Sequence, residues 1–343
     1  MDDNDVRYDV IVVGGGAAGL SGALLLARAR WRVLVLDDGS PRNAPAGGVH
    51  NWLTRDGLPP AEIARIGRAE VTGYGGVVRD ARVTAARTTA RGVVVTTADG
   101  TEHTGRRLLV TTGLTDEIPE IDGLADRWGG DVFGCPFCHA WEHRDTRIGV
   151  LSTGPHDLMK AHIAARWSDD VTLFLHTGPE PDDEQWAGFA ACGISVVDGQ
   201  VTGTVIRDGH LAGLQLASGT VVPVDALTIS PRAVARAGFL AGLGLEPVEH
   251  PSGLGAAVPA GQDGRTSVPG VWVAGNVADP MSTVPAAVAA GSVAAAGITR
   301  DLIAADVESA RSITRTADPF SAASEAECAA RVAGDRVHGL SVG

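Results

Sequence analysis

The stretch YDVIVVGGGAAGLSGALLLARARWRVLVLDDG, residues 8–39, contains an apolar run, a glycine-rich turn, an alanine- and leucine-rich segment and a second apolar run. The β-branched residues 10–13 are typical of a strand buried on both faces, and residues 33–36 predict a second such strand. Between them, residues 17–30 have helical composition. The order strand, turn, helix, strand predicts an α/β unit with parallel strands, and this unit decides the fold class.

Three glycines at this turn form a G-x-G-x-x-G pattern between the predicted strand and helix. One allows the tight turn, one lets the backbone approach a pyrophosphate, and one lets the helix pack on the strand. The first amides of the helix then face the phosphates, and a carboxylate at the end of the second strand can bind a ribose. We therefore expect a dinucleotide site formed by Gly14, Gly16, Ala17, Ala18, Gly19, Asp37 and Asp38.

The composition limits the classes of partner. The chain has 343 residues, of which 44% are hydrophobic and 20% charged, enough for a sizeable core and two domains. A formal net charge of -13 without a basic patch argues against nucleic acid and anionic membranes as partners. We identify no apolar run long enough to cross a bilayer and no signal-peptide pattern at the N-terminus, so we expect a cytoplasmic protein.

Two of the four cysteines, Cys135 and Cys138, lie close together in GCPFCHAWEH, residues 134–143. A zinc site with four thiolate ligands needs a second close pair, but Cys192 and Cys328 each stand alone, so we expect no metal site. In a reducing compartment a close pair is better suited to redox chemistry than to scaffolding. The pair is therefore a candidate redox disulfide.

Two later segments specify the dinucleotide. Residues 106–124 contain a buried strand followed by a threonine-glycine turn, and residues 270–298 contain a strand, a Gly-Asn turn and a small-residue helix. With the first glycine motif, they resemble the low-molecular-weight thioredoxin reductases, which are FAD-dependent pyridine nucleotide-disulphide oxidoreductases, over about residues 8–298. The resemblance implies FAD as cofactor, with further contacts from Thr112, Gly113, Gly275 and Asn276. Asn276 replaces the usual aspartate, and an ordinary β-α loop is the alternative interpretation of that turn.

The resemblance also implies an α/β fold with two Rossmann-like domains and accessory β-meanders. Residues 1–115 and 246–343 would form a discontinuous FAD domain, in which 300–343 is a C-terminal extension. Residues 116–245 would form a second nucleotide-type domain that carries the cysteine pair. Alternation predicts the meanders within residues 75–101 and 200–224. Members of the family are usually homodimers, so we expect a homodimer.

Roles within the cysteine segment follow from the same resemblance. It implies that Cys138 packs against the flavin and that Cys135 exchanges disulfide with the substrate. Thioredoxin reductases carry an aspartate after the second cysteine, whereas this chain has His139. An imidazole with an ordinary pKa near ~6.5 can take a thiol proton near neutral pH. A packing role is the alternative for His139.

The second domain repeats the pattern of strand, turn and helix in residues 147–178, but its phosphate-binding chemistry is degraded. The turn reads STGPHD, residues 152–157, in which Pro155 lacks an amide and Asp157 brings a negative charge toward the expected pyrophosphate. The next strand is followed by residues 176–178, His-Thr-Gly, where arginines are expected to grip the 2′-phosphate of NADPH. We expect a domain that kept its fold and lost its nucleotide.

This combination is similar to the dithiol oxidases of the gliotoxin and holomycin pathways. Those enzymes close an intramolecular disulfide in a small natural product and pass electrons through FAD to O2, releasing H2O2. The run of residues 40–57 looks like their flavin-side loop, so Arg42, His50 and Asn51 are expected near FAD, whereas Trp52 is more simply a packing residue. The implied partners are a small-molecule dithiol and O2. An NADPH-dependent thioredoxin reductase and a non-catalytic FAD-bound redox sensor are the alternatives.

Overall fold

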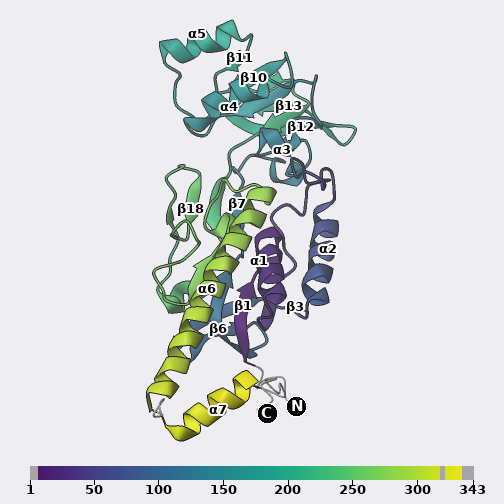
Figure 1. Ribbon diagram of the computed structural model, residues 1–343. Helices are drawn as coiled ribbons and strands as arrows, with labels where there is room; N and C mark the ends of the chain where they lie inside the picture. Colours follow the sequence, from purple (N-terminus) through teal and green to yellow (C-terminus); the bar gives the residue numbers. More distant parts are fainter. Residues whose placement is uncertain (1–6, 317–320, 334–343) are drawn as a thin grey trace. The chain divides into compact units, whose positions relative to one another are not determined.

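The computed structural model describes residues 7–316 and 321–333 of the chain. The chain divides into two compact units, with the boundary between Ala296 and Gly297. The first unit holds all the strands within the described residues and helices α1 to α5 (Figure 1). The second holds the C-terminal part of α6 and all of α7, Ala322–Ala333. The remainder of the predicted C-terminal extension lies outside the described residues.

The first sheet has seven strands in the order β3-β2-β1-β6-β5-β4, with β19 also paired to β6. Strands β3, β2, β1, β6 and β19 are parallel, whereas β5 and β4 extend the sheet in antiparallel pairing. Every residue of β1 is buried, as the β-branched run predicted. The strands are β1 (Tyr8–Val13), β2 (Val33–Asp37), β3 (Val77–Asp80), β4 (Val83–Thr89), β5 (Gly92–Thr97), β6 (Glu102–Val110) and β19 (Val271–Val273).

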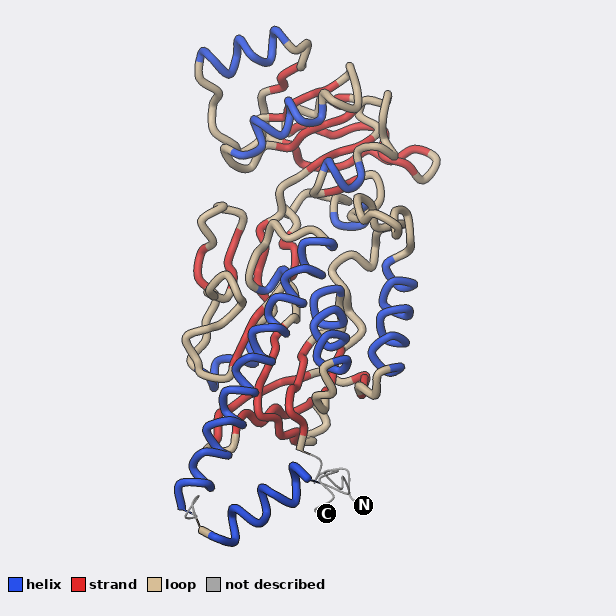
Figure 2. The backbone as a smooth tube through the Cα atoms, viewed as in Figure 1, coloured by secondary structure: helices blue, strands red, loops and turns tan. Residues whose placement is uncertain are grey.

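Helices α1 (Ala17–Arg28), α2 (Pro60–Gly73) and α6 (Val284–Thr316) accompany this sheet. In Figure 2, α1 and the start of α6 run side by side, and the Ser21 hydroxyl donates to the carbonyl of Val288 at 2.8 Å. A Cβ atom at Gly291 would lie 2.0 Å from the Ala18 carbonyl oxygen, so only glycine permits this approach. The N-terminus of α1, where the dinucleotide is expected, is thus fixed by α6.

Helix α6 corrects one expectation from the sequence. Its segment Val284–Ser312 is long and apolar enough, by length and composition, to cross a membrane. However, Ala287, Ala294 and Ala295 are buried, and the helix is hydrogen-bonded to α1. The small residues of the first part of the helix serve close packing on α1, so we interpret that part as a core helix, whereas Ile303 and Val307 further along the helix are exposed.

The second sheet has five strands, all parallel, in the order β11-β10-β9-β15-β8. Helices α3 (Pro136–His139), α4 (His156–Ala164) and α5 (Asp183–Ala191) belong to this part of the chain. One wholly parallel sheet and one largely parallel sheet, each with helices, confirm the predicted α/β class. The strands are β8 (Val132–Phe133), β9 (Ile148–Leu151), β10 (Val171–Phe174), β11 (Ser195–Val197) and β15 (Ala226–Thr228).

The remaining strands form the accessory sheets. One meander is β12-β13-β14, and the other is the antiparallel run β4-β5-β6. Strand β3 does not belong to the meander predicted within residues 75–101, because it pairs in parallel with β2. A four-stranded sheet, β17-β18-β16-β7, pairs strands from both sides of the predicted domain boundaries, which remain a prediction. These strands are β7 (Leu114–Glu117), β12 (Val201–Arg207), β13 (His210–Leu216), β14 (Val221–Val222), β16 (Arg232–Ala235), β17 (Val248–Glu249) and β18 (Gly255–Ala257).

Candidate active site

The first glycine turn closes tightly against the end of β6. Gly14 has a φ of +102°, and a Cβ atom there would lie 2.5 Å from the carbonyl oxygen of Thr111. The Thr111 hydroxyl donates to the Gly14 carbonyl at 2.7 Å. At Gly19 a Cβ atom would lie 1.9 Å from the Gly14 carbonyl oxygen. Both positions therefore require glycine, the first for its backbone conformation and the second for packing of α1 on the turn.

Gly16 has a different environment from these two glycines. A Cβ atom built there would have no neighbour within 4 Å, so the backbone faces open space. Gly16 is also the N-cap of α1, and no side chain caps that helix end. Unpaired amides at a helix N-terminus that face an open cavity bind phosphate groups well. The turn therefore fits the pyrophosphate of a dinucleotide.

Asp37 ends β2 beside this turn and is held from two sides. Its Oδ1 accepts from the Gly15 amide at 2.9 Å, and its Oδ2 accepts from the Arg68 guanidinium at 2.6 Å. Arg68 also donates to Asp80 at 2.6 Å, and hydrogen bonds to Asp80 and Asp37 raise the pKa of Arg68. Sequence reasoning missed Arg68, because it lies in α2 and nothing local links it to β2. The fixed carboxylate fits the expected ribose contact.

The turn after β6 and the loop after β2 are each held by hydrogen bonds to other segments of the chain. The Thr112 hydroxyl donates to the Arg236 carbonyl at 2.7 Å, and the Gly113 carbonyl accepts from the Arg236 amide at 3.0 Å. The guanidinium of Arg42 makes two hydrogen bonds to the buried Asp116 carboxylate, each at 2.7 Å. Arg42 is therefore a preoriented cation, not a freely mobile one.

The turn after β19 contains Gly275 and Asn276, and its hydrogen bonds show why asparagine suits this position, where the resemblance implies an aspartate. The Asn276 side-chain amide donates to the carbonyls of Ser282 at 2.9 Å and Asp279 at 3.1 Å. A carboxylate could not donate these bonds. The amide group thus orders the loop 279–282, and its oxygen is left as the acceptor that a ribityl hydroxyl needs. Gly275, with a φ of +75°, brings this turn against Ala18 of α1.

One cavity of about 2100 Å³ collects these segments. Binding sites for single drug-sized ligands are typically about 300–1,000 Å³, so this cavity has room for a dinucleotide and a second molecule. Gly19 is the only residue of the predicted site that does not line the cavity, in keeping with its packing role. The predicted residues that line it are Gly14, Gly16, Ala17, Ala18, Asp37, Asp38, Arg42, His50, Asn51, Thr112, Gly113, Cys135, Cys138, His139, Gly275 and Asn276.

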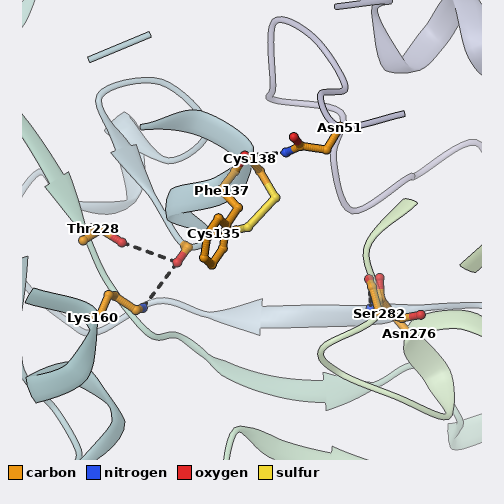
Figure 3. Close-up of a disulfide and its surroundings, with 9 residues drawn as sticks. Asn51, Cys135, Phe137, Cys138, Lys160, Thr228, Asn276 and Ser282 are labelled. Carbon is orange, nitrogen blue, oxygen red and sulfur yellow. Dashed lines mark hydrogen bonds between the residues drawn. A yellow bond between two sulfur atoms is a disulfide. The ribbon is translucent and has the colours of Figure 1, made fainter. Parts of the chain in front are cut away.

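Cys135 and Cys138 form a disulfide, with their Cα atoms 5.3 Å apart. Figure 3 shows the Asn51 side chain directed at this segment, where its amide donates to the carbonyl of Phe137 at 2.5 Å. The ring nitrogens of His50 lie 3.5 Å from Asp56 and 3.5 Å from Glu142. The loop of residues 40–57 therefore contacts the cysteine segment directly. Trp52, expected to be a packing residue, is half-buried and also lines the cavity.

His139 lies immediately after the second cysteine and has an unusual environment. Both ring nitrogens are buried and have no hydrogen-bond partner. The ring stacks on Phe133, with 5.9 Å between centroids and an interplanar angle of 20°. Burial lowers the pKa of His139, although Glu142 opposes the shift. The imidazole is therefore neutral near pH 7, and its buried ring nitrogens could take a proton from a molecule in the cavity only after they become accessible.

The second nucleotide loop, between β9 and α4, is filled by its own side chain. The Asp157 carboxylate accepts from the amides of Thr153 at 2.9 Å and Gly154 at 3.0 Å, and only 1% of this side chain is exposed. After β10, the His176 ring accepts from the Val201 amide at 3.0 Å. A Cβ atom at Gly178 would lie 1.9 Å from the Ser152 hydroxyl oxygen, so that loop packs directly on the turn. Two of the amides that could hold a phosphate are therefore already used.

Comparison with known proteins agrees with this geometry. A family model described as pyridine nucleotide-disulphide oxidoreductase matches residues 8–291. The chain is 30% identical over 317 residues to thioredoxin reductase sirT of Leptosphaeria maculans, covering 88% of this chain and 96% of that protein. It is 31% identical over 317 residues to thioredoxin reductase tcpT of Claviceps purpurea, covering 89% and 97%.

Among solved structures, HlmI superposes with a TM-score of 0.84 at 39% identity, covering 90% of this chain and 97% of that one. An oxidoreductase from Agrobacterium tumefaciens gives a TM-score of 0.82 at 33% identity, covering 87% and 99%. The glycine turn, the Asp37 carboxylate and the cavity that joins them to the disulfide are the features that such a flavoprotein needs. The chain belongs to the pyridine nucleotide-disulphide oxidoreductases and is an FAD-binding enzyme similar to thioredoxin reductases.

Proposed function

We propose that this protein is a dithiol oxidase that closes an intramolecular disulfide in a small natural-product dithiol and delivers the electrons to O2. In the first half of the cycle, the dithiol exchanges with the Cys135–Cys138 disulfide through a mixed disulfide. It leaves as a cyclic disulfide, and both protein cysteines become thiols. FAD, when bound, supplies the two-electron acceptor that reoxidises this pair and passes the electrons to O2. The balance is one dithiol and one O2 consumed for one disulfide and one H2O2 formed.

The observation that carries the proposal is the filled second nucleotide loop. A pyrophosphate would have to displace the Asp157 carboxylate from the amides of Thr153 and Gly154. That displacement would leave a buried negative charge next to the phosphates, which is costly. A loop occupied in this way disfavours a nicotinamide hydride donor and so supports entry of the electrons from another donor. The disulfide offers that entry, since it opens into the large cavity.

The cavity also supports the substrate class. Besides the predicted residues and several charged ones, the side chains that line it include the apolar Trp52, Phe137 and Met281, and Phe137 is 63% exposed. An exposed aromatic ring between two redox cysteines favours a compact, largely apolar substrate. The cytoplasmic location and the homodimer expected from the sequence remain part of this proposal. An NADPH-dependent thioredoxin reductase is the runner-up, favoured by the names of the fungal relatives.

The stoichiometry tests this proposal. Aerobic protein given dithiothreitol, without NADPH, is expected to consume one O2 and release one H2O2 for each dithiol oxidised, measured with an oxygen electrode, a peroxidase assay and thiol titration. The variant with both Cys135 and Cys138 replaced by serine serves as the control, because any bound flavin would remain. Turnover that requires added NADPH would favour the runner-up instead.

A second prediction concerns His139. The His139→Ala variant is expected to reduce flavin with dithiothreitol about 10²-fold more slowly than wild type near pH 7, because the proton acceptor is lost. The difference should shrink toward pH ~8.5, where substrate thiols ionise unaided. Because burial lowers the pKa of His139, the wild-type rate should decline only below the ordinary imidazole pKa. Stopped-flow absorbance across this pH range measures all three expectations.

His143 offers a matched control for this variant. Its ring stacks on the same Phe133, with 5.4 Å between centroids, but His143 does not line the cavity. The His143→Ala variant should keep the wild-type rate near pH 7, whereas its decline at low pH should begin at a slightly higher pH, because the His143 charge is one of the causes that lower the pKa of His139. If His139→Ala keeps the wild-type profile, then His139 has only a packing role.

A further inference from the structure

Lys160 is the single lysine of the chain, and it lies in α4 with only 13% of its side chain exposed. Its ammonium donates to the Ile229 carbonyl at 2.8 Å, to the Ser230 hydroxyl at 2.5 Å and to the Gly134 carbonyl at 3.3 Å. An ammonium has three hydrogens, so all of its donors are used. Figure 3 shows the lysine reaching the peptide that precedes Cys135.

The charge of Lys160 is balanced by Asp157 in the filled nucleotide loop. The ammonium lies 3.7 Å from the Asp157 carboxylate, and the Ser230 hydroxyl donates to that carboxylate. Burial lowers the pKa of Lys160, and Asp157 opposes this shift. A buried ammonium without such a partner would be strongly destabilising. The carboxylate that occupies the loop amides therefore also holds the lysine in place.

Gly134 connects Lys160 to the segment that holds Cys135 and Cys138. It lies between β8 and α3, directly before Cys135, and its carbonyl also accepts from the Thr228 hydroxyl of β15 at 3.4 Å. A Cβ atom at Gly134 would lie 3.1 Å from the ring of Trp128, so there is little room for the peptide to shift. The peptide that carries Cys135 is thus fixed by donors from α4 and β15.

We infer that Lys160 is a positioning residue for Cys135, and that the former nucleotide loop, closed by Asp157, has become a support for the redox disulfide. The inference rests on the proposed function, because it assumes that Cys135 and Cys138 cycle between disulfide and dithiol. In each cycle the sulfur–sulfur bond opens and must close again. A fixed Gly134 peptide keeps the Cys135 sulfur within reach of its partner, and loss of such positioning lowers both closure and exchange rates.

The test uses the FAD-bound double variant Lys160→Met/Asp157→Asn, which removes both charges together and leaves no unpaired buried ion. In anaerobic buffers of reduced and oxidised dithiothreitol, alkylation measures the fraction of Cys135–Cys138 disulfide. We expect half reduction at about a tenfold lower ratio of reduced to oxidised dithiothreitol, which is about 30 mV for two electrons. The limiting rate of flavin reduction by dithiothreitol should fall about tenfold or more.

The Arg147→Met/Asp225→Asn variant is the matched control. This ion pair lies in the same part of the chain but does not contact Gly134. It should lower the melting temperature without moving the redox equilibrium. If the Lys160 double variant does not fold, Lys160→Gln/Asp157→Asn is tested instead, since the glutamine amide can still contact Ser230 but is too short to hold the Gly134 carbonyl.

The outcomes separate the two hypotheses. If wild-type flavin is not reduced by dithiothreitol at all, the proposed function fails. If wild type reacts and the folded, FAD-bound Lys160 variant keeps both the redox equilibrium and the limiting rate within about twofold of wild type, only the role of Lys160 is overturned. A shift in the Lys160 variant and none in the Arg147 control supports it.

Discussion

Replacement of Cys135 by serine is expected to abolish dithiol oxidation and to give a long-wavelength absorption band from the Cys138 thiolate beside the flavin. The disulfide opens into the cavity that also contains the glycine turn, and the proposed function places the Cys138 sulfur toward the cofactor and the Cys135 sulfur toward the substrate. With Cys135 gone, Cys138 has no partner and stays a thiol. Absorbance spectra between pH 6 and 9 would show the band appear as the thiolate forms.

Cys138→Ser is the matched variant, because it removes the other sulfur of the same pair. It should also abolish turnover, but without the long-wavelength band, since the proposed function places the remaining Cys135 thiol on the substrate side. If the band appears in Cys138→Ser and not in Cys135→Ser, then Cys135 is the cysteine beside the flavin and Cys138 is the one that meets the substrate. Turnover in both variants would mean that the pair is not the redox centre, and the proposed function would be withdrawn.

The second large effect is the loss of NADPH binding. The amides of Thr153 and Gly154 are occupied by Asp157, and the loop after β10 presents His176 to the Val201 amide. Each lost hydrogen-bond donor to a phosphate, and each missing bidentate arginine, costs on the order of 1–3 kcal/mol of binding free energy. The opposing carboxylate adds to this cost. Because 1.4 kcal/mol is tenfold in affinity, several decades should be lost.

Equilibrium titration measures this loss directly. We expect no saturable change in flavin or protein fluorescence with NADPH up to about 1 mM, which corresponds to a binding free energy near -4 kcal/mol. Free adenosine nucleotides serve as the control for non-specific quenching. Saturation in the low micromolar range would show that the loop rearranges to admit the nucleotide.

Much of the fold follows from local sequence patterns. The buried β-branched run predicted β1, and the glycine spacing predicted the turn in which Gly14 adopts a positive φ. These features depend on neighbours in the chain, so they can be inferred without knowing the tertiary structure. The same holds for the close cysteine pair, which the structure shows as a disulfide.

Features that depend on distant partners were not predictable. Arg68 reaches Asp37 from a separate helix, and Lys160 reaches Gly134 across the second sheet. The sequence predicted a negative charge at Asp157 but not that its carboxylate would bind the loop amides itself. The packing of α6 was not predictable either, because the close approach of Gly291 to Ala18 joins residues far apart in the chain.

The measurement that tests the central claim most directly is anaerobic stopped-flow absorbance of the FAD-bound protein mixed separately with excess NADPH and with excess dithiothreitol. The account predicts that the flavin absorbance stays unchanged over seconds with NADPH and is bleached by the dithiol, because the second nucleotide loop is closed by Asp157 while the disulfide opens into the cavity. Rapid bleaching by NADPH would contradict the account and identify a reductase.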